Sequence, residues 1–386
     1  MAHTICYNRD CSLSPLRILL MGDASNYHRT LACGLRSLGH EVTVASAGSG
    51  WMRTGRDIDL SRPCGGKLGG ALLWAKVRRL LPRLSGYDVV QIVSPNFLEL
   101  RPHRIRGVFD ELRARNGAVF LTALGNDSRY VEFAGDPSRL RYSEWQVGGA
   151  PTHHAVEASQ TRREWLGEEL RLHDNYIYSN IDGIGTALYE YHACCREMRD
   201  APDLQYCGIP VDTATVERAC CLEVPGKVRI FVGVQRGRMA EKGTDRMLAA
   251  AQEVVARHPD KAELVVVENR PYDEYIALMT SSHVMLDQLY SYTPATNALL
   301  AMARGMTVLS GAEPEYYDFI GEHENHPIVN ALPDDEALRR QIEEVVMHPD
   351  RLPQTGTKGR EFVMKHNDSQ VVAKRFLELW QRNLKC

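Results

Sequence analysis

Two segments in the second half of the chain place charged side chains where predicted strands end. In FVGVQRGRMAEKGTD (231–245), a strand ends near Gly233. Three cations follow before the next helix: Arg236, Arg238 and Lys242. A guanidinium fork and an ammonium suit a diphosphate, because both are fixed donors that face several anionic oxygens. A solvated basic turn explains this segment equally well when it is taken alone.

The other segment is LDQLYSYTPATNALLAMARGMTVLSGAEPEYY (286–317). A strand ends at Asp287, a polar loop follows, and Pro294 stands near the start of the helix ATNALLAMA. The free N–H groups and partial positive charge of a helix N-terminus can hold a phosphate. The polar candidates near that phosphate are Thr296 and Asn297 in the first turn, and Glu313 and Glu315 after the next strand.

The first half of the chain offers polar residues at comparable positions. The loop after the first predicted strand contains four candidates. We assign Gly22 to the substrate that donates a group, the donor side, and Asp23, Asn26 and His28 to the substrate that receives it, the acceptor side. Asn126 and Asp127 follow another strand and join the acceptor-side candidates. Helix capping is the commoner role for an Asp or Asn such as Asp23 or Asn26. A helix-surface position is the commoner one for His28.

Strands and helices alternate along the chain, and the alternation restarts once. Apolar or β-branched runs predict strands at 17–22, 41–46, 88–93, 118–124 and near 181–185, and again at 227–234, 262–267, 283–286, 306–310 and 327–330. This pattern predicts an α/β fold with two Rossmann-like domains, each a parallel sheet with helices on both faces. Because ligands bind at the carboxyl ends of such strands, the candidates should face one cleft between the domains.

The segment CGIPVDT (207–213) lies between the two series and is the best candidate for a hinge. We therefore expect an N-terminal domain over 1–206 and a second domain over 214–365. The last helix begins near Asp368, and the segment 366–386 is expected to pack back on the first domain. Tyr130 and the residues up to 150 are expected to form a long loop.

Composition excludes several classes of protein. The 386 residues carry a net charge of −3 and no apolar run that approaches a membrane-spanning helix. The N-terminus lacks an apolar signal core, and the ten cysteines form no C-x-x-C pair, so we expect a cytoplasmic protein without a zinc or disulfide scaffold. Neither G-x-G-x-x-G nor G-x-x-x-x-G-K-[ST] occurs, which argues against dehydrogenases and P-loop proteins.

Positive charge is concentrated in one zone. Residues 51–106 contain 11 Lys and Arg against 4 Asp and Glu, which indicates one anionic partner surface and not nucleic-acid binding. Within it, ALLWAKVRRLLPR (71–83) has an apolar face and a basic face. Such a helix can lie on an anionic membrane, here the inner face, or pack on its own sheet. The packed helix is the favoured alternative.

Together the segments resemble glycosyltransferases of the GT-B fold, most closely glycosyltransferase family 4. The matching pieces are GLRSLGHEVTV (34–44), ALGNDSR (123–129), CGIPVDT (207–213), KGTDRMLAAAQ (242–252) and AMARGMTVLSG (301–311) with EPEYY after it. The resemblance implies transfer of a sugar from a nucleotide-sugar to a glycan or lipid-linked acceptor. It also implies retention of configuration, no required metal and no cofactor, and a role in surface polysaccharide synthesis.

The resemblance maps the family's diphosphate-binding Arg and Lys onto Arg238, or Arg236, and Lys242. Its later acidic residue maps onto Glu313 or Glu315. The family's two glutamates, which lie eight positions apart before A-M-A, are replaced by Tyr292 and Leu300. One hypothesis is that Tyr292, Thr296 and Asn297 take over as neutral hydrogen-bonding groups on the donor.

Two alternatives stay open at this stage. One keeps the fold and changes the reaction, to a nucleotide-sugar epimerase or a sugar phosphorylase. The other is a GT-B-shaped binding protein that has lost catalysis. Asp57 and Asp59 form a D-x-D motif, which binds a metal in the other major glycosyltransferase fold, but they follow no clear strand.

Overall fold

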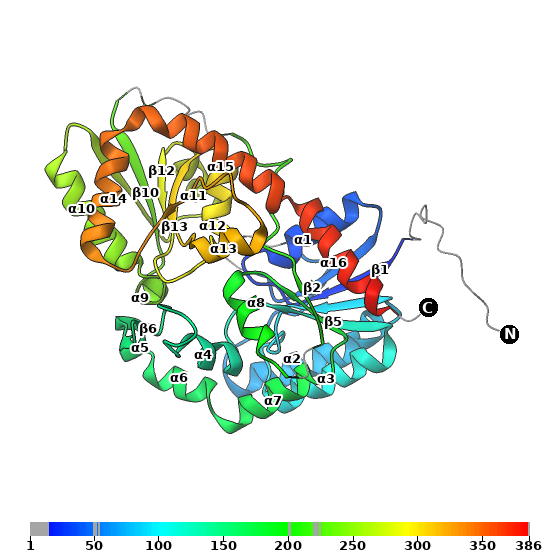
Figure 1. Ribbon diagram of the computed structural model, residues 1–386. Helices are drawn as coiled ribbons and strands as arrows, with labels where there is room; N and C mark the ends of the chain where they lie inside the picture. The colour runs from blue at the N-terminus through cyan, green and yellow to red at the C-terminus, as the bar shows by residue number, and fades with distance from the viewer. Residues whose placement is uncertain are drawn as a thin grey trace.

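The computed structural model describes residues 15–48, 52, 55–199, 202–218, 224 and 226–384. Apart from one short hairpin, its described strands form two separate parallel sheets, one from each half of the chain (Figure 1). Helices cover both faces of each sheet. The predicted fold class, two Rossmann-like α/β domains, is confirmed.

The first sheet has the strand order β3-β2-β1-β4-β5-β8-β9. Five of its strands coincide with the apolar runs of the sequence: β1 (Arg17–Met21), β2 (Glu41–Ser46), β4 (Val89–Ile92), β5 (Ala118–Ala123) and β8 (Gly183–Thr186). The sequence did not predict the two edge strands, β3 (Ile58–Asp59) and β9 (Asp203–Tyr206). Both are short and polar, because an edge strand is packed on fewer sides than a central one.

Side chains that alternate along each strand divide the first domain into two cores. Ile18 and Leu20 of β1 pack under α1 (Tyr27–Ser37) and the C-terminal helix α16 (Ser369–Asn383). Leu19 and Met21 face the opposite side. That side is covered by α2 (Gly66–Leu80), the 3-10 turn η1 (Leu81–Leu84), α3 (Pro102–Arg115) and α7 (Glu168–Tyr178), while α8 (Tyr189–Arg196) follows β8.

The second sheet has the order β11-β10-β12-β13-β14. Its strands are β10 (Val228–Val234), β11 (Ala262–Glu268), β12 (Val284–Leu286), β13 (Thr307–Ser310) and β14 (Val329–Asn330). One face is covered by α10 (Thr244–Arg257) and α14 (Asp335–Met347). The other is covered by α11 (Tyr272–Thr280), α12 (Thr296–Ala303), α13 (Pro314–Ile320) and α15 (Leu352–His366), which follows the 3-10 turn η3 (Pro349–Arg351).

The chain crosses between the domains twice, and the two crossings are hydrogen-bonded to each other. The Val211 N–H donates to the Asn367 carbonyl at 2.7 Å, and the Ser369 N–H donates to the Val211 carbonyl at 2.8 Å. After the second crossing, α16 lies against α1 and the β8–β9 edge of the first domain (Figure 1). Trp380 of α16 is fully buried there, and its indole N–H donates to Gln91 at 2.9 Å.

The segment after β5 is more ordered than the long loop that we expected. It contains α4 (Ser128–Ala134), the hairpin of β6 (Gln146–Val147) and β7 (Ala150–Pro151), α5 (His153–Glu157) and α6 (Ser159–Trp165). Gly148 and Gly149 form the hairpin turn with φ of 57° and 87°, a conformation that glycine adopts without strain. The expected loop at 130–150 is interrupted by the end of α4 and by this hairpin, whose Gly-Gly turn signal was missed, while 135–145 contain neither helix nor strand. Helix α5 contacts α9 (Met239–Lys242) of the second domain (Figure 1).

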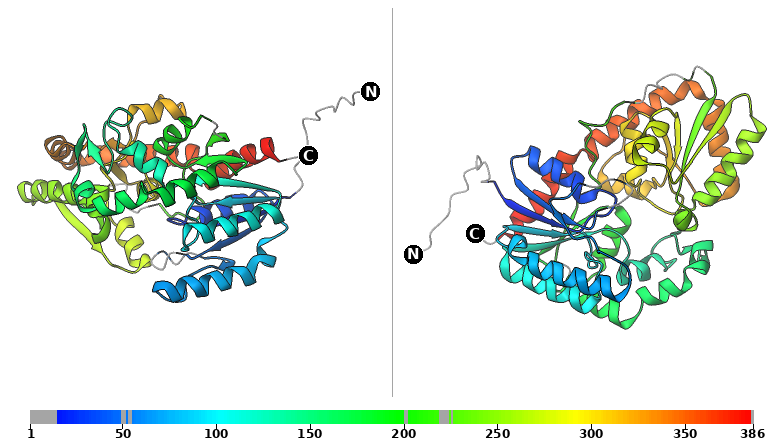
Figure 2. Two further views of the ribbon diagram at one scale, coloured as in Figure 1. Left: turned by 90° about the horizontal axis from the view of Figure 1, so that it is seen from below. Right: turned by 180° about the vertical axis from the view of Figure 1, so that it is seen from behind.

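The amphipathic segment 71–83 forms most of α2 and η1, at the outer edge of the first domain (Figure 2). Leu73 and Val77 are fully buried against the sheet, as the packed-helix interpretation requires. Leu68 and Leu72 are exposed on the opposite face. Among the helices of the described residues, none is long and apolar enough to cross a membrane.

Gly34 sets how closely α1 and α16 approach each other. A Cβ at this position would lie 2.1 Å from the Ser369 carbonyl oxygen, which is backbone and cannot rotate away. We therefore expect Gly34→Ala to destabilise the protein by about 1–3 kcal/mol, the usual cost of overpacking. Thermal unfolding followed by circular dichroism should show a Tm several degrees lower.

Gly107→Ala is the matched control, because Gly107 lies in α3 and its Cβ would meet Trp74 at an ordinary 3.8 Å. Alanine is the better helix former, so this variant should keep or raise the Tm. An unchanged Tm for Gly34→Ala would contradict the close packing of α1 on α16.

Candidate functional site

A cavity of about 590 Å³ lies between the two domains, and both contribute to its walls. Five of the residues singled out from the sequence line it: Asn126, Arg238, Lys242, Thr296 and Asn297. The first domain adds residues from the ends of β1, β5 and β8, and the second domain adds residues from the ends of β10, β11 and β12. This is the strand-end location that the topology predicts for a ligand.

The basic segment after β10 forms one wall. Arg238 ends the 3-10 turn η2 (Arg236–Arg238), and Lys242 ends α9. Gly243 has a φ of 68°, which lets α10 begin directly after Lys242. The Lys242 carbonyl accepts from the Leu289 N–H at 2.8 Å, so this wall is fixed to the loop that follows β12.

The three cations of this segment have different surroundings. Arg238 lies in the wall, but its Nε is 2.9 Å from Glu241, which holds part of its charge. Lys242 lies in the wall near the buried carboxyl of Asp287, whose pKa is raised by burial and lowered by the lysine. Arg236 lies outside the lining, is 80% exposed and pairs with Glu268. Of this segment, Arg238 and Lys242 therefore line the cavity, and Arg270, which follows β11, lines it as a third cation.

The N-terminus of α12 forms the adjoining wall. Ala295, Thr296 and Asn297 line the cavity, and the N-cap residue, Ala295, makes no side-chain cap. The first turn of α12 therefore borders the same space as Lys242. The N–H of Ala298 in the next position already donates to Asp287. This arrangement can hold an anion by charge and by hydrogen bonds.

The first domain contributes carboxylates that we did not predict, Glu144 and Glu190. Glu190 lies in the first turn of α8 and accepts from the Tyr292 N–H at 2.5 Å and from the Thr293 N–H at 3.1 Å. Its other oxygen accepts from the Thr293 hydroxyl at 2.6 Å. Burial raises the pKa of Glu190, and these donors oppose that effect. A carboxylate of one domain thus holds the loop 291–293 of the other.

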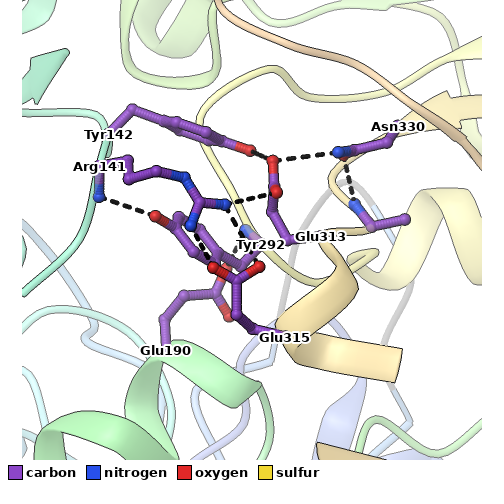
Figure 3. Close-up of polar contacts among 8 residues, drawn as sticks. Arg141, Tyr142, Glu190, Tyr292, Glu313, Glu315 and Asn330 are labelled. Carbon is purple, nitrogen blue, oxygen red and sulfur yellow. Dashed lines mark hydrogen bonds and ion pairs between the residues drawn. The ribbon is translucent and has the colours of Figure 1, made fainter. Parts of the chain in front are cut away.

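Arg141 makes a second connection between the domains (Figure 3). Its guanidinium Nη2 lies 2.6 Å from Glu313 and 3.2 Å from Glu315, and it also stacks over the Tyr292 ring at 5.1 Å. Glu313 is 3% exposed and accepts further from Tyr142 and, at 3.0 Å, from Asn330. Hydrogen bonding to Arg141 lowers the pKa of Glu315. We call Arg141, Tyr142, Glu313 and Glu315 the interdomain latch.

Three residues that the sequence suggested as donor-binding are engaged in or beside this latch. Neither Glu313 nor Glu315 lines the cavity, because both side chains point toward Arg141 (Figure 3). Tyr292 is also outside the lining; it is buried, and its hydroxyl accepts from the Arg141 N–H at 2.7 Å. Of the three neutral residues named as substitutes for the missing glutamates, only Thr296 and Asn297 face the cavity.

Two candidates after β1, Asp23 and His28, make hydrogen bonds that hold this part of the fold. Asp23 accepts from the N–H groups of His28 at 3.0 Å and Arg29 at 3.2 Å, so it caps α1. Burial raises the pKa of Asp23 to about 6. His28 is fully buried and its Nδ1 lies 2.7 Å from the Gly22 carbonyl, so the helix-surface interpretation was wrong. Burial lowers the pKa of His28 to about 4.

Three further candidates have backbone or capping roles. Gly22 has a φ of 76° and packs closely against Val93. Asn26 precedes α1 with a left-handed backbone and makes no side-chain cap. Asp127 caps α4 and accepts from the Tyr178 hydroxyl at 2.7 Å, and burial raises its pKa to about 6. Of the acceptor-side candidates, Asn126 alone lines the cavity.

The D-x-D motif lies away from this cavity. Asp57 pairs with Arg36, and Asp59 pairs with Arg56 and Lys76. In the part of the chain that the structure describes, no group of three or more His, Cys, Asp or Glu side chains is arranged to hold a metal ion.

Comparison with known proteins gives a family for part of the chain and a fold for nearly all of it. Residues 238–378 match the family model described as glycosyl transferase-like. Sucrose-phosphate synthase from Thermosynechococcus elongatus is 15% identical, with a TM-score of 0.61 over 95% of this chain and 98% of that one. Anabaena HepE, in complex with UDP and glucose, is 12% identical, with a TM-score of 0.58 over 95% and 100%.

A glycosyltransferase from Rickettsia africae is 12% identical, with a TM-score of 0.52 over 97% of this chain and 100% of that one. The chain has the GT-B fold. No curated protein sequence matches it. The matched family region supplies Arg238, Lys242 and α12, and together with the fold it supports a glycosyltransferase.

The sequence analysis missed three residues of this site, and only one of them has a recognisable pattern in its local sequence. Glu190 comes three residues after the apolar GIGTA strand end, so the strand-end rule applied to 181–185 would have found it. Glu144 and Arg141 lie in the segment expected to be a loop. Nothing in their local sequence indicates that they reach the other domain.

The latch yields a stability prediction for this GT-B protein. Arg141→Ala removes the one cationic partner that the described residues provide for the buried Glu313. We expect a loss of about 1–3 kcal/mol, the cost of leaving a buried polar group without its partner. Thermal unfolding should show a lower Tm at pH 7. The difference from the wild type should shrink as the pH falls through the lowered pKa of Glu315, since Glu315 then loses the negative charge that pairs with Arg141.

Arg139→Ala is the control, because Arg139 lies in the same segment and pairs with the exposed Asp136 and Glu197. Such exposed pairs contribute at most about 1 kcal/mol. Equal Tm losses for the two variants would show that the latch does not hold the domains together.

Proposed function

We propose that the protein transfers a sugar from a nucleotide-sugar to a glycan or lipid-linked acceptor, in the synthesis of a surface polysaccharide or glycoconjugate. The reaction proceeds with retention of configuration and without a metal ion, as in glycosyltransferase family 4. The observation that carries the proposal is the cavity whose second-domain wall combines Arg238, Lys242 and the N-terminus of α12. That wall is suited to a diphosphate.

The chemistry of the wall matches the charge that the reaction creates. When the bond between the anomeric carbon and the diphosphate breaks, its electron pair goes to the diphosphate oxygen. Fixed positive charge beside that oxygen stabilises the transition state more than the ground state. Lys242 and Arg238 supply this charge as cations, and the first turn of α12 supplies N–H donors.

The first-domain wall is the acceptor side in this proposal. It is lined by Asn126, Glu144, Tyr130 and Tyr191, which offer hydrogen-bonding groups for hydroxyls of a sugar. The fold-sharing structure of Anabaena HepE contains UDP and glucose, which makes UDP-glucose the first donor to test.

The proposal includes peripheral contact with an anionic membrane through 71–83. In the structure, the apolar side of this segment is buried, so the contact would use the exposed Leu68 and Leu72 together with Arg79 and Arg83. Exposed cations beside exposed leucines suit an anionic surface.

The wall predicts the effect of removing its cations. Lys242→Ala should lower kcat for sugar transfer or donor hydrolysis by about 100-fold or more, the scale of losing one preorganised electrostatic contact. Arg238→Ala should have a smaller effect, because Glu241 already holds part of its charge. The donor nucleotide is identified first by thermal shift with UDP, GDP, ADP and CMP, since a bound ligand raises the Tm. Release of that nucleotide from its glucose, mannose or N-acetylglucosamine conjugates then gives kcat.

Arg236→Ala is the matched control. It removes a cation of the same turn that lies outside the cavity lining and pairs with Glu268, so turnover and nucleotide affinity should stay at wild-type values. If Lys242→Ala behaves like Arg236→Ala, the segment is a solvated basic turn and the proposal loses its main support.

Metal independence is a separate prediction. Because the leaving diphosphate is neutralised by Lys242, Arg238 and the α12 N-terminus, turnover should persist in EDTA. The measurement is the rate of nucleotide release at roughly 5-fold and roughly 50-fold molar excesses of EDTA over protein. Turnover that disappears in chelator and returns with manganese or magnesium would refute metal independence.

A further inference from the structure

The loop 291–293 of the second domain is bound by one carboxylate of the first. Glu190 extends from α8 toward this loop (Figure 3). Its Oε1 accepts from the N–H of Tyr292 at 2.5 Å and from the N–H of Thr293 at 3.1 Å. Its Oε2 accepts from the Thr293 hydroxyl at 2.6 Å. Three donors of a short loop therefore end on one side chain of the opposite domain.

Backbone groups of the first domain add to this contact. The Tyr189 N–H donates to the Thr293 hydroxyl oxygen at 3.1 Å, and the Arg141 N–H donates to the Tyr292 hydroxyl at 2.7 Å. Both contacts end on side chains of the loop, whereas Glu190 binds the loop's own backbone. The position of that backbone in the second domain is therefore tied to a residue of the first domain.

This loop leads directly into a wall of the cavity. Ser291 lines the cavity before the two bound residues, and the first turn of α12 lines it after them. Between Thr293 and the N-cap residue Ala295 stands only Pro294, whose ring fixes φ. A displacement of Thr293 is therefore passed on to the first turn of α12. Because hydrogen bonds need donor–acceptor distances of about 2.7–3.2 Å, a shift of about 1 Å removes a contact to a ligand.

The contact forms only when the two domains lie together, since its two sides belong to different domains. Glu190 is 2% exposed. Burial raises the pKa of Glu190, and the hydrogen bonds that it accepts oppose that effect. A buried carboxylate and buried N–H groups are each costly without a partner, so the loop and Glu190 stabilise each other in this arrangement.

We propose that Glu190 is a positioning residue: it holds the first turn of α12 where that turn binds a diphosphate, so the first domain completes the donor site of the second. This role rests on the proposed transferase function. Glu190 acts through the loop 291–293 and takes no part in making or breaking bonds, so it leaves the stereochemical course of the reaction unchanged.

The experiment compares the affinity for a nucleoside diphosphate with the affinity for its nucleoside. Binding of UDP, GDP and ADP to the full-length protein is measured by calorimetry, and binding of uridine, guanosine and adenosine by ligand-observed NMR. Glu190→Ala should weaken the diphosphate that binds the wild type by about tenfold or more, the scale of losing a hydrogen bond to a charged group. Affinity for the nucleoside should stay within about threefold, a change of less than 1 kcal/mol.

Glu190→Gln tests whether placement or charge matters. Its amide oxygen can accept from the N–H groups of Tyr292 and Thr293, and its NH₂ group can donate to the Thr293 hydroxyl oxygen. The loop keeps its position in this variant although the negative charge is gone. Affinity for the diphosphate should therefore return to within about threefold of the wild type, a change of less than 1 kcal/mol.

Asp174→Ala is the matched control for lost stability. Asp174 is a buried carboxylate of α7 that accepts from the N–H of Ser128 at 2.8 Å and from its hydroxyl at 2.6 Å, and it lies outside the cavity lining. Both alanine variants should have a lower Tm. Only Glu190→Ala should lose its preference for the diphosphate over the nucleoside.

Thr293→Val is the milder variant, because it removes one of the three donors and keeps both N–H groups. It should weaken the diphosphate by about twofold to fivefold, the scale of one neutral hydrogen bond. Circular dichroism shows whether each variant is folded. If Glu190→Ala does not fold, Thr293→Val decides, and wild-type affinity for the diphosphate in that variant overturns the inference.

Each contrary result has a distinct meaning. An unchanged preference for the diphosphate in folded Glu190→Ala would overturn the positioning role. Glu190→Gln as weak as Glu190→Ala would also overturn it, because the charge and not the placement would then matter. An equal loss in Asp174→Ala would assign the effect to stability alone. Each of these results contradicts this inference and leaves the proposed function standing, whereas a wild-type protein that binds none of the three diphosphates contradicts both.

Discussion

Carboxylates buried at the boundary between the domains must find donors, and in this protein the donors come from the opposite domain. Glu190 of the first domain is satisfied by backbone N–H groups of the second, and Glu313 of the second by Arg141 and Tyr142 of the first. A buried charge without a partner is costly, so the two domains satisfy their acidic groups only together. These contacts join the two domains beside the cavity.

The same interactions fix the loop that follows β12. The carboxyl of this loop, Asp287, is buried and lies outside the cavity lining. Glu190 instead reaches the loop from the first domain, and the Tyr292 ring turns toward Arg141 (Figure 3). Carboxylates of both domains therefore line the cavity, Glu144 and Glu190 from the first and Glu241 from the second, and they face Lys242 and the first turn of α12.

The apolar core supports this arrangement from behind. One continuous cluster of buried side chains runs from α1 and α16 of the first domain to α12 and α15 of the second. Trp380 and Phe376 anchor the end of the chain in the first domain, and the crossings at Val211 and Asn367 are hydrogen-bonded together. The domain boundary thus combines the cavity with a continuous apolar core.

The sequence by itself determined the fold, because each central strand is a continuous apolar or β-branched run and each covering helix has one apolar face. A run that is buried on both faces of the sheet can only be a central strand, as β5 at 118–123 illustrates, and a helix with one apolar face, such as α16, packs that face on the sheet. It also determined the cationic wall, since Arg238 and Lys242 follow a strand end directly. Only the tertiary structure decided the partners of the acidic residues. Arg141 and Glu313 are 172 positions apart, and a charge that pairs over such a separation leaves no periodicity or spacing in the local sequence.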